Sequence, residues 1–156
     1  MVRALITGIK GFAGSHLAEH LLEQGVEVCG VDLEDAPTDN LRSILPSVDV
    51  FGCDLRDGGK LIELFKHLRP RHVYHLAGQT SVRSSWEDPG STLAANIMGA
   101  FHVLQGTLAA ESDEVKVLMV SSAEVYGDRA ALKGPITEEQ PLEPRTPYAL
   151  SKACVE

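Results

Sequence analysis

The chain has 156 residues, of which 44% are hydrophobic and 23% charged, and its formal net charge is −8. This length and apolar content suffice for one domain with an ordinary core. The acidic balance argues against a nucleic-acid partner, because such a surface needs a basic face to neutralise phosphates. A small anionic ligand is still allowed, since it needs only local backbone N–H groups and a few cations.

Targeting and cysteine patterns indicate a cytoplasmic protein with no membrane partner. No apolar run has membrane-spanning length, and the apolar start at residues 4–6 reaches glycine and lysine too soon for a signal peptide. The three cysteines, Cys29, Cys53 and Cys154, are far apart without paired spacing. Neither a disulfide framework nor a cysteine zinc site is expected.

Short apolar, β-branched runs alternate with longer helical patterns along the chain. The expected strands cover residues 2–7, 27–31, 48–52, 72–76 and 115–121, and the expected helices cover residues 12–24, 59–68 and 92–110. Several of these strands are apolar without strict alternation, as is typical when helices cover both faces of a parallel sheet. The predicted fold class is therefore α/β, a Rossmann-type doubly wound parallel sheet.

A loop-like stretch rich in proline, glycine and charge, residues 126–147, follows the fifth strand. A further helix is expected after it, with Thr146 as the N-cap and Pro147 at the first helical position, where a missing N–H does no harm. Little more than two turns remain before Glu156, which is short for a helix. We expect the sequence to be truncated.

The segment "LITGIKGFAGSHLAEHL", residues 5–21, contains a glycine pattern that directly follows the first strand and opens the first helix. In this context Gly8, Gly11 and Gly14 let backbone N–H groups and the helix N-terminus meet a pyrophosphate. Asp32 ends the second strand about where an acidic residue binds the ribose hydroxyls of a dinucleotide. The spacing is G-x-x-G-x-x-G and not G-x-G-x-x-G, which favours a variant of the dinucleotide fingerprint. The order of strand, glycines, helix and acidic residue argues against a tight turn without ligand.

The same segment spells H-x-x-E-H with His16, Glu19 and His20, a zinc-hydrolase signature. A zinc site would need both histidines in an open cleft together with a third ligand from elsewhere. This helix must instead cover the sheet with one face, for which the candidates are Phe12, Leu17, Leu21 and Leu22. We therefore expect a polar stripe and no metal site.

A second constellation lies near the end of the chain. Tyr148 and Lys152 are four residues apart, on one helical face, and a lysine ammonium favours the phenolate of a neighbouring tyrosine. Tyr148 would then act as a general acid or base. Ser122 ends the fifth strand at the carboxyl edge of the sheet, where it would donate to a substrate oxygen. Glu124 is either a solvated loop carboxylate or a second acid–base group.

Six motifs in order resemble the extended short-chain dehydrogenase/reductase family, the NAD-dependent nucleotide-sugar epimerases, dehydratases and reductases. The motifs are "TGIKGFAGSHL" (7–17), "CDL" (53–55), "HLAGQTSV" (75–82), "NIMGAFHVL" (96–104), "SSAEVYG" (121–127) and "YALSK" (148–152). The resemblance spans almost the whole chain. It implies that Ser122, Tyr148 and Lys152 are catalytic, and it raises the same expectation for Glu124, which matches a glutamate that dehydratases use.

The resemblance also assigns the cofactor contacts. The glycines would receive the pyrophosphate, Asp32 would hold the adenosine ribose, Asp54 and Leu55 would border the adenine, and Asn96 would support the active site. The residues expected at the cofactor are Gly8, Gly11, Phe12, Gly14, Asp32, Asp54, Leu55, Ala77, Gly78, Asn96, Tyr148 and Lys152. No arginine adjoins Asp32 and Leu33 to bind a 2′-phosphate, so NAD is expected and NADP is the alternative.

The resemblance implies that the phenolate takes the proton of the sugar 4-hydroxyl while hydride passes from C4 to the nicotinamide. A reductase runs this step backwards. Ala123 stands where dTDP-glucose dehydratases have an aspartate, which counts against that type, and "TSVRSSWEDP" at residues 80–89 resembles the reductases. The expectation is 4-keto reduction or 4,6-dehydration of a GDP-linked deoxyhexose, with 4-epimerisation as an alternative.

Family members continue beyond the Tyr–Lys helix, completing the sheet and adding a smaller domain for the nucleoside diphosphate. We therefore expect residues 1–156 to form an NAD(P)-binding Rossmann domain that carries the catalytic trio, with the last strands and the C-terminal substrate domain absent. Such a chain is either the N-terminal part of a working enzyme or a non-catalytic dinucleotide-binding fragment. The resemblance implies a homodimer for the full-length protein, through helices at residues 92–110 and from Pro147.

Overall fold

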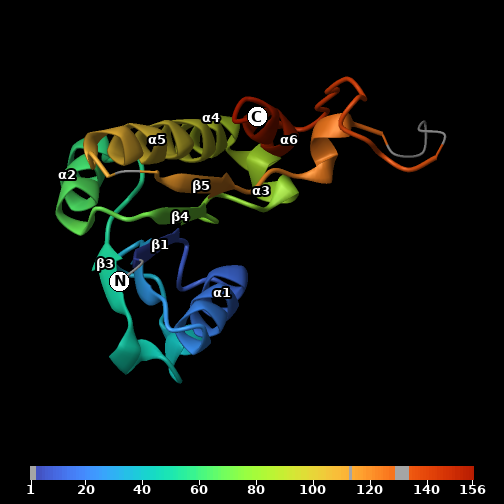
Figure 1. Cartoon of the computed structure of the whole chain (residues 1–156). Coiled ribbons are helices and arrows are strands. Elements are labelled where there is room, and N and C mark those ends of the chain that lie inside the picture. Colours follow the sequence, from blue (N-terminus) through green and yellow to red (C-terminus); the bar gives the residue numbers. More distant parts are fainter. Residues whose placement is uncertain (1–2, 113, 129–133) are drawn as a thin grey trace. The chain divides into compact units, whose positions relative to one another are not determined.

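The computed structural model describes residues 3–112, 114–128 and 134–156 (Figure 1). The chain divides into two compact units. The sheet unit comprises the residues up to 77 together with 99–120, and the helical unit comprises residues 78–98 and 121–156.

The sheet unit is built on five parallel strands in the order β3-β2-β1-β4-β5. The strands are β1 (Arg3–Thr7), β2 (Glu27–Asp32), β3 (Asp49–Gly52), β4 (His72–His75) and β5 (Lys116–Met119). The described ends of each strand lie within two residues of those predicted. The strand order reverses between β1 and β4, at the kind of switch point where open α/β sheets bind ligands. The predicted Rossmann-type parallel sheet is confirmed.

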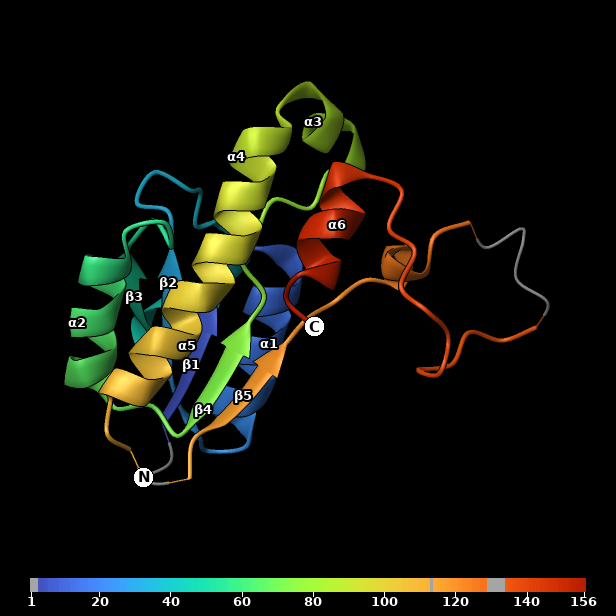
Figure 2. The same cartoon turned by 90° about the horizontal axis from the view of Figure 1, so that it is seen from above.

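Helices cover both faces of this sheet, with α1 on one side and α2 and α5 on the other (Figures 1 and 2). Their bounds are α1 (Phe12–Glu23), α2 (Gly58–Leu68) and α5 (Gly99–Ala109). Two short 3₁₀ turns, η1 (Asp39–Leu41) and η2 (Leu45–Ser47), lie between β2 and β3. The sheet is therefore doubly wound, as the uninterrupted apolar strands predicted.

The centre of β1 supplies both halves of the core, because neighbouring strand residues point to opposite faces. Leu5 belongs to the apolar cluster of Phe65 and Val103, from α2 and α5. Ile6 belongs to a second cluster that contains Ala18 of α1. All five side chains are fully buried.

One expectation about α1 is wrong. Leu17, Leu21 and Leu22 pack against the Ile6 cluster as predicted, but Phe12 is 76% exposed. Phe12 is the first residue of the helix, so it precedes the part of α1 that packs on the strands. Its ring lies instead 4.5 Å from that of His16, one turn further along.

The described elements of the helical unit are short. These are α3 (Val82–Glu87), α4 (Pro89–Leu93), the π-helical η3 (Ala94–Met98), the 3₁₀ turn η4 (Ala123–Tyr126) and α6 (Pro147–Ala153). The continuous α-helix expected over residues 92–110 is wrong in form, because α4, η3 and α5 occupy that stretch in turn. The sequence did not predict α3.

Polar caps define these short helices. Ser81 caps α3 by accepting from Ser84 N at 3.1 Å, and Asp88 caps α4 by accepting from Ser91 N at 2.9 Å. The predicted start of α6 is confirmed, because Thr146 Oγ1 accepts from Ala149 N at 2.9 Å. None of these helices needs a long apolar stripe to begin, which is why periodicity alone missed α3.

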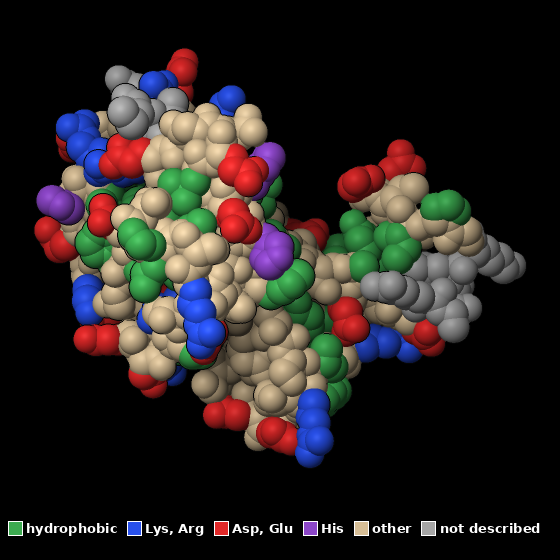
Figure 3. Space-filling model, turned by 90° about the horizontal axis from the view of Figure 1, so that it is seen from below, with side chains coloured by type: hydrophobic (Ala, Val, Ile, Leu, Met, Phe, Trp, Pro, Cys, Tyr) green, Lys and Arg blue, Asp and Glu red, His purple; other side chains and the backbone are tan. Residues whose placement is uncertain are grey.

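No helix in the described parts of the chain combines the length and apolar character needed to cross a membrane. On the face drawn in Figure 3, basic and acidic side chains are interspersed and do not separate into regions of one sign.

Candidate functional site

The loop from β1 into α1, residues 8–14, is called the glycine turn below. Gly8 has a φ of +75°, a left-handed conformation that favours glycine. Its N–H donates to Val31 O of β2 at 2.8 Å, and a Cβ at this position would lie 2.8 Å from Ala77 N. The turn thus lies against the segment that follows β4, and no side chain fits at position 8.

The start of α1 packs directly onto this turn. Gly11 N donates to Gly8 O at 3.1 Å, and a Cβ on Gly14 would stand only 2.1 Å from the same oxygen. Gly11 is the N-cap residue and no side chain caps the helix there. The backbone N–H groups of the first turn and the positive end of the helix dipole therefore suit an anionic group such as a phosphate.

Asp32, the last residue of β2, lies beside the glycine turn as predicted. Its Oδ2 accepts from Lys10 N at 2.8 Å and its Oδ1 accepts from Leu33 N at 2.9 Å. A carboxylate has about four acceptor sites, so capacity remains for two further donors. This geometry suits two neighbouring hydroxyls of one ligand.

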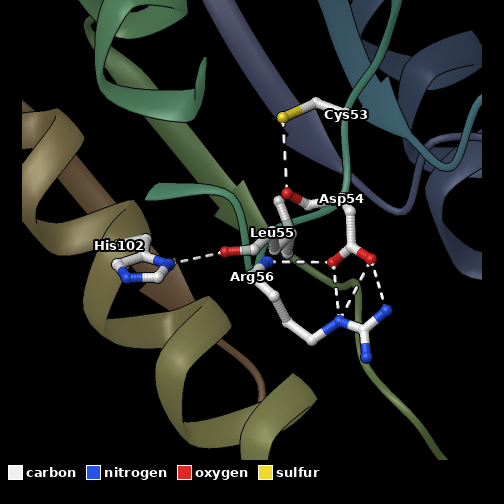
Figure 4. Close-up of polar contacts among 5 residues, drawn as sticks. All are labelled: Cys53, Asp54, Leu55, Arg56 and His102. Atoms are coloured by element: carbon white, nitrogen blue, oxygen red, sulfur yellow. Dashed lines mark hydrogen bonds and ion pairs between the residues drawn. The ribbon is translucent and has the colours of Figure 1, made fainter. Parts of the chain in front are cut away.

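Asp54 and Leu55 lie in the loop after β3, which joins the same region because Cys53 N donates to Asp32 O at 2.8 Å. Arg56 binds the Asp54 carboxylate through its backbone N–H, Nε and Nη2, the last at 2.6 Å (Figure 4). These contacts, led by the side-chain hydrogen bonds, lower the pKa of Asp54. The carboxylate is therefore ionised and fixed in orientation.

His102 of α5 holds the same loop from its other side. The Leu55 carbonyl lies 2.7 Å from His102 Nδ1, and since a carbonyl only accepts, we assign the proton to Nδ1 (Figure 4). A Cβ on Gly58 would lie 2.7 Å from the imidazole ring. The loop therefore needs both this histidine and this glycine to keep its path.

A buried pair at the switch point was missed in the sequence. Thr7 Oγ1 lies 2.8 Å from His75 Nδ1 and accepts from Ala77 N at 3.2 Å, and both side chains are buried. The Thr7 hydroxyl thus contacts both the His75 ring and the backbone N–H of Ala77. The pair fixes Ala77, whose backbone crowds Gly8.

The residues of the H-x-x-E-H pattern lie along α1. His16, Glu19 and His20 are exposed, and His16 Nδ1 is 3.1 Å from Phe12 O within the same helix. Across residues 3–112, 114–128 and 134–156, no three His, Cys, Asp or Glu side chains are grouped so that they would hold a metal ion.

Asn96 lies in the π-helical turn η3 and is 4% exposed. Its Oδ1 accepts from Gln79 N at 2.8 Å, and its Nδ2 donates to Gln79 O at 3.0 Å and to Ser151 Oγ at 2.8 Å. A Cβ on Gly78 would lie 2.8 Å from Asn96 Oδ1. One amide thus joins three segments of the helical unit, and π-helical turns of this kind are frequent at functional sites.

Tyr148 and Lys152 share one face of α6 at the predicted spacing, and both are partly buried. Burial lowers the pKa of Lys152 from its ordinary value of 10.5. Between them, the fully buried Ser151 donates from Oγ to Tyr148 O at 2.7 Å while accepting from Asn96. Ser151 therefore links the tyrosine helix to η3, a role that its sequence position did not reveal.

Ser122 and Glu124 begin η4. Ser122 Oγ accepts from Glu124 N at 3.2 Å, which leaves the hydroxyl proton for another acceptor. Both side chains are partly buried, which distinguishes Glu124 from a fully solvated loop carboxylate.

A model of the GDP-mannose 4,6-dehydratase family matches residues 5–156. The chain belongs to this family. The resemblance drawn from the six motifs is thereby confirmed, and members of the GDP-mannose 4,6-dehydratase family are found among its individual relatives as well.

Two curated relatives carry different activities. A GDP-mannose 4,6-dehydratase of Yersinia enterocolitica is 33% identical, with 97% of this chain matching 43% of that protein. A GDP-6-deoxy-D-mannose reductase of Pseudomonas aeruginosa is 36% identical, with 99% of this chain matching 45% of that protein. The chain thus spans less than half the length of these relatives.

A solved structure adds a third activity. The UDP-glucose 4-epimerase of Thermus thermophilus, a complex with NAD, superposes with a TM-score of 0.83 at 36% identity. The match covers 97% of this chain and 48% of the epimerase chain. These relatives share the fold, and their names include three different reactions on nucleotide sugars.

Proposed function

We propose that this chain provides the NAD-binding and proton-transferring parts of an enzyme that transfers hydride at C4 of a nucleotide-bound sugar. The substrate class is a GDP-linked deoxyhexose, and the reaction is 4-keto reduction or 4,6-dehydration. The observation that carries the proposal is the glycine turn with Asp32 beside it, in which a Gly14 Cβ would stand 2.1 Å from Gly8 O.

The residues around this turn fit a dinucleotide. The N–H groups at the start of α1 would hold the pyrophosphate, and Asp32 would accept from the two hydroxyls of the adenosine ribose. Asp54 and Leu55 would border the adenine and Ala77 and Gly78 the path toward the nicotinamide. The Asp32 carboxylate would repel a 2′-phosphate, so NAD is the proposed cofactor, as in the Thermus thermophilus complex.

When bound, the nicotinamide ring would accept or return the hydride. Tyr148 would take the proton of the sugar 4-hydroxyl during oxidation and return it during reduction. Lys152 would favour the phenolate and hold the nicotinamide ribose. Because burial lowers its pKa, Lys152 loses its proton more easily than an exposed lysine does. Ser122, whose Oγ keeps its proton for another acceptor, would donate to the sugar oxygen.

The choice among reactions depends on Glu124. A dehydratase needs an acid–base group to remove water between C5 and C6, and the partial burial of Glu124 supports that role. The family match and both curated relatives favour a GDP-linked sugar. The epimerase relative supports 4-epimerisation as the second candidate, and a dinucleotide-binding fragment without turnover is the third.

The proposal extends to organisation and setting. We place the protein in the cytoplasm, and we propose that a further domain of the full-length protein holds the nucleoside diphosphate, because the relatives are more than twice as long as the matched segment. We also propose a full-length homodimer. Supporting this, α5 exposes Phe101, Leu104 and Leu108 at helical spacing, with exposures of 48%, 43% and 81%.

A thermal melt of this chain with NADH and with NADPH tests the cofactor half of the proposal. We expect a cooperative transition that NADH raises more than NADPH, because a ligand that binds only the folded state stabilises it. A cooperative melt indifferent to both would contradict the proposed site. With the full-length gene product, turnover of GDP-4-keto-6-deoxymannose with NADH, or of GDP-mannose, separates reductase from dehydratase. Turnover of neither would contradict both and leave 4-epimerisation and the fragment without turnover as the candidates.

A further inference from the structure

Lys10, between Ile9 and Gly11 in the glycine turn, is 8% exposed although it carries a charged side chain. Its ammonium donates to Leu33 O at 2.8 Å and to Glu34 O at 3.2 Å. Burying an amine is unfavourable unless it is hydrogen-bonded, so this is a built contact and not an incidental one. It ties the glycine turn to the segment that follows β2.

The backbone of the same residue binds Asp32. Lys10 N donates to Asp32 Oδ2 at 2.8 Å, and Leu33 N donates to Asp32 Oδ1 at 2.9 Å. The two N–H groups that orient the carboxylate therefore belong to Lys10 and Leu33. The hydrogen bond from the Lys10 ammonium to Leu33 O links these two residues. Backbone, carboxylate and ammonium form a closed ring of hydrogen bonds.

A further contact holds this ring in place. Asn40 Nδ2 donates to Lys10 O at 2.9 Å, across the loop between β2 and η1. Lys10 thus bonds through its N–H, its carbonyl and its side chain at once. Loss of the ammonium would remove the two side-chain hydrogen bonds that hold the Leu33–Glu34 segment to the glycine turn.

We propose that Lys10 is a positioning residue that makes the site selective for a free vicinal diol on the adenosine ribose, an inference that rests on the proposed function. It acts through Asp32. Two acceptor sites of the Asp32 carboxylate are filled by fixed N–H groups, which hold the other two sites in one orientation. The two hydroxyls of a diol fill both remaining sites, whereas a 2′-deoxyribose fills only one. Two of the three ammonium donors already bind backbone carbonyls and the side chain is 8% exposed, which favours a positioning role over direct phosphate binding.

The test measures dissociation constants of the chain for NADH, for its 2′-deoxyadenosine analogue and for NADPH. Wild type should prefer NADH to the deoxy analogue by about tenfold, the order expected for one hydrogen bond to a charged acceptor. Lys10→Met should reduce this preference to less than about threefold. Lys10→Arg, which keeps the charge and the donors, should restore part of it. Lys60→Met, at an exposed lysine of α2, is the matched control and should leave it unchanged.

A double-mutant cycle separates positioning from general stability. Asp32→Asn should also reduce the preference, and adding Lys10→Met to it should change the preference no further. If Lys10→Met fails to fold, Lys10→Gln takes its place, because its shorter side chain cannot reach both carbonyls. An equal loss of affinity for both ligands, with the preference unchanged, would overturn the inference. So would a loss confined to NADPH.

The two proposals fail in different ways. If the wild-type chain melts cooperatively but binds no NADH, both the proposed cofactor site and the role of Lys10 are overturned. If wild type binds NADH and prefers it to the deoxy analogue, but the Lys10 variants keep that preference, only the positioning role is overturned.

Discussion

The sheet unit and the helical unit are held together by different interactions. In the sheet unit, parallel backbone pairing and two apolar clusters fix every strand, and the glycine turn follows from how closely β1, β4 and α1 approach one another. In the helical unit, single polar side chains such as Asn96 and Ser151 join short segments. The proposed cofactor cradle therefore depends on backbone fit, and the proposed catalytic helix depends on a few hydrogen bonds.

The largest effect should come from adding a side chain where the backbone is closest. Gly14→Ala places a Cβ 2.1 Å from the backbone oxygen of Gly8, and neither atom can turn away, so relief requires α1 to move away from the glycine turn. We expect a loss of about 3 kcal/mol or more in the free energy of unfolding, together with loss of NADH binding. Denaturant unfolding and a NADH titration measure the two effects.

Gly59→Ala is the matched control. Its Cβ would meet only Asp57 Oδ1 at 3.6 Å, an ordinary contact, and α2 should gain about 0.5–1 kcal/mol from the better helix former. If the two alanine variants had the same free energy of unfolding and the same NADH affinity, the glycine turn would adapt to a side chain and would not depend on close backbone fit.

In the helical unit, the chemical step should depend on one hydroxyl. Tyr148→Phe keeps the ring and the helix but removes the proposed acid–base group, so hydride transfer by the full-length protein should fall by about 10²–10⁴-fold. NADH affinity should change little, because the ring is kept and the proposed contacts to the pyrophosphate and the adenosine ribose come from the glycine turn and Asp32. Single-turnover kinetics and a NADH titration measure both quantities.

Tyr74→Phe provides the comparison. This tyrosine packs beside the Ile6 cluster of the sheet and should leave the rate unchanged. If Tyr148→Phe retained most of its activity, another residue would have to move the proton, and the proposed mechanism would be wrong.

Ser151→Ala tests whether hydrogen bonds place the catalytic helix. It removes the acceptor for Asn96 Nδ2 and leaves that buried donor with one partner fewer, which should reduce stability by about 1–3 kcal/mol. Because α6 would lose its link to η3, kcat of the full-length protein should fall while KM for NADH stays close to wild type. Ser91→Ala, at an exposed position of α4, should change neither. A fall in stability with kcat intact would make Ser151 structural only.

The same contrast explains what the sequence revealed. Apolar runs located the five described strands within two residues of their ends, because strands depend on local pattern and on parallel-sheet geometry. The glycines and Asp32 lie together as expected, and the cofactor cradle drawn from them stays a proposal. The π-helical turn and α3 were missed because polar caps and a local change of helical pitch leave no period in the sequence. Phe12 was misplaced because a helix wheel does not show where the sheet ends.

The site residues that the sequence did not reveal are those whose partners are distant in the sequence. The Lys10 ammonium binds carbonyls at positions 33 and 34, and Ser151 binds an amide 55 residues away. Neither residue type signals such a partner until the fold brings the two together. The Thr7–His75 pair likewise follows from the register of β1 against β4, which places these two residues side by side.

The smallest effect should come from an exposed ion pair at the edge of the sheet unit. Arg56 lowers the pKa of Asp54 below its ordinary 3.8, so this pair contributes stability above that value and loses it as the pH falls through the folded pKa. Arg56→Gln should therefore lower the melting temperature slightly at pH 7, with the difference from wild type shrinking through the acid range. High salt should shrink it as well.

Asp54→Asn distinguishes the contribution of the Asp54–Arg56 pair to the melting temperature from other effects of Arg56. In that background Arg56→Gln has no carboxylate to release, so the pH dependence of its effect should vanish. A pH-dependent difference that persisted there would place the titrating partner of Arg56 elsewhere. The pair also holds the Asp54 carboxylate in the loop after β3 (Figure 4), so its removal should weaken NADH binding as well.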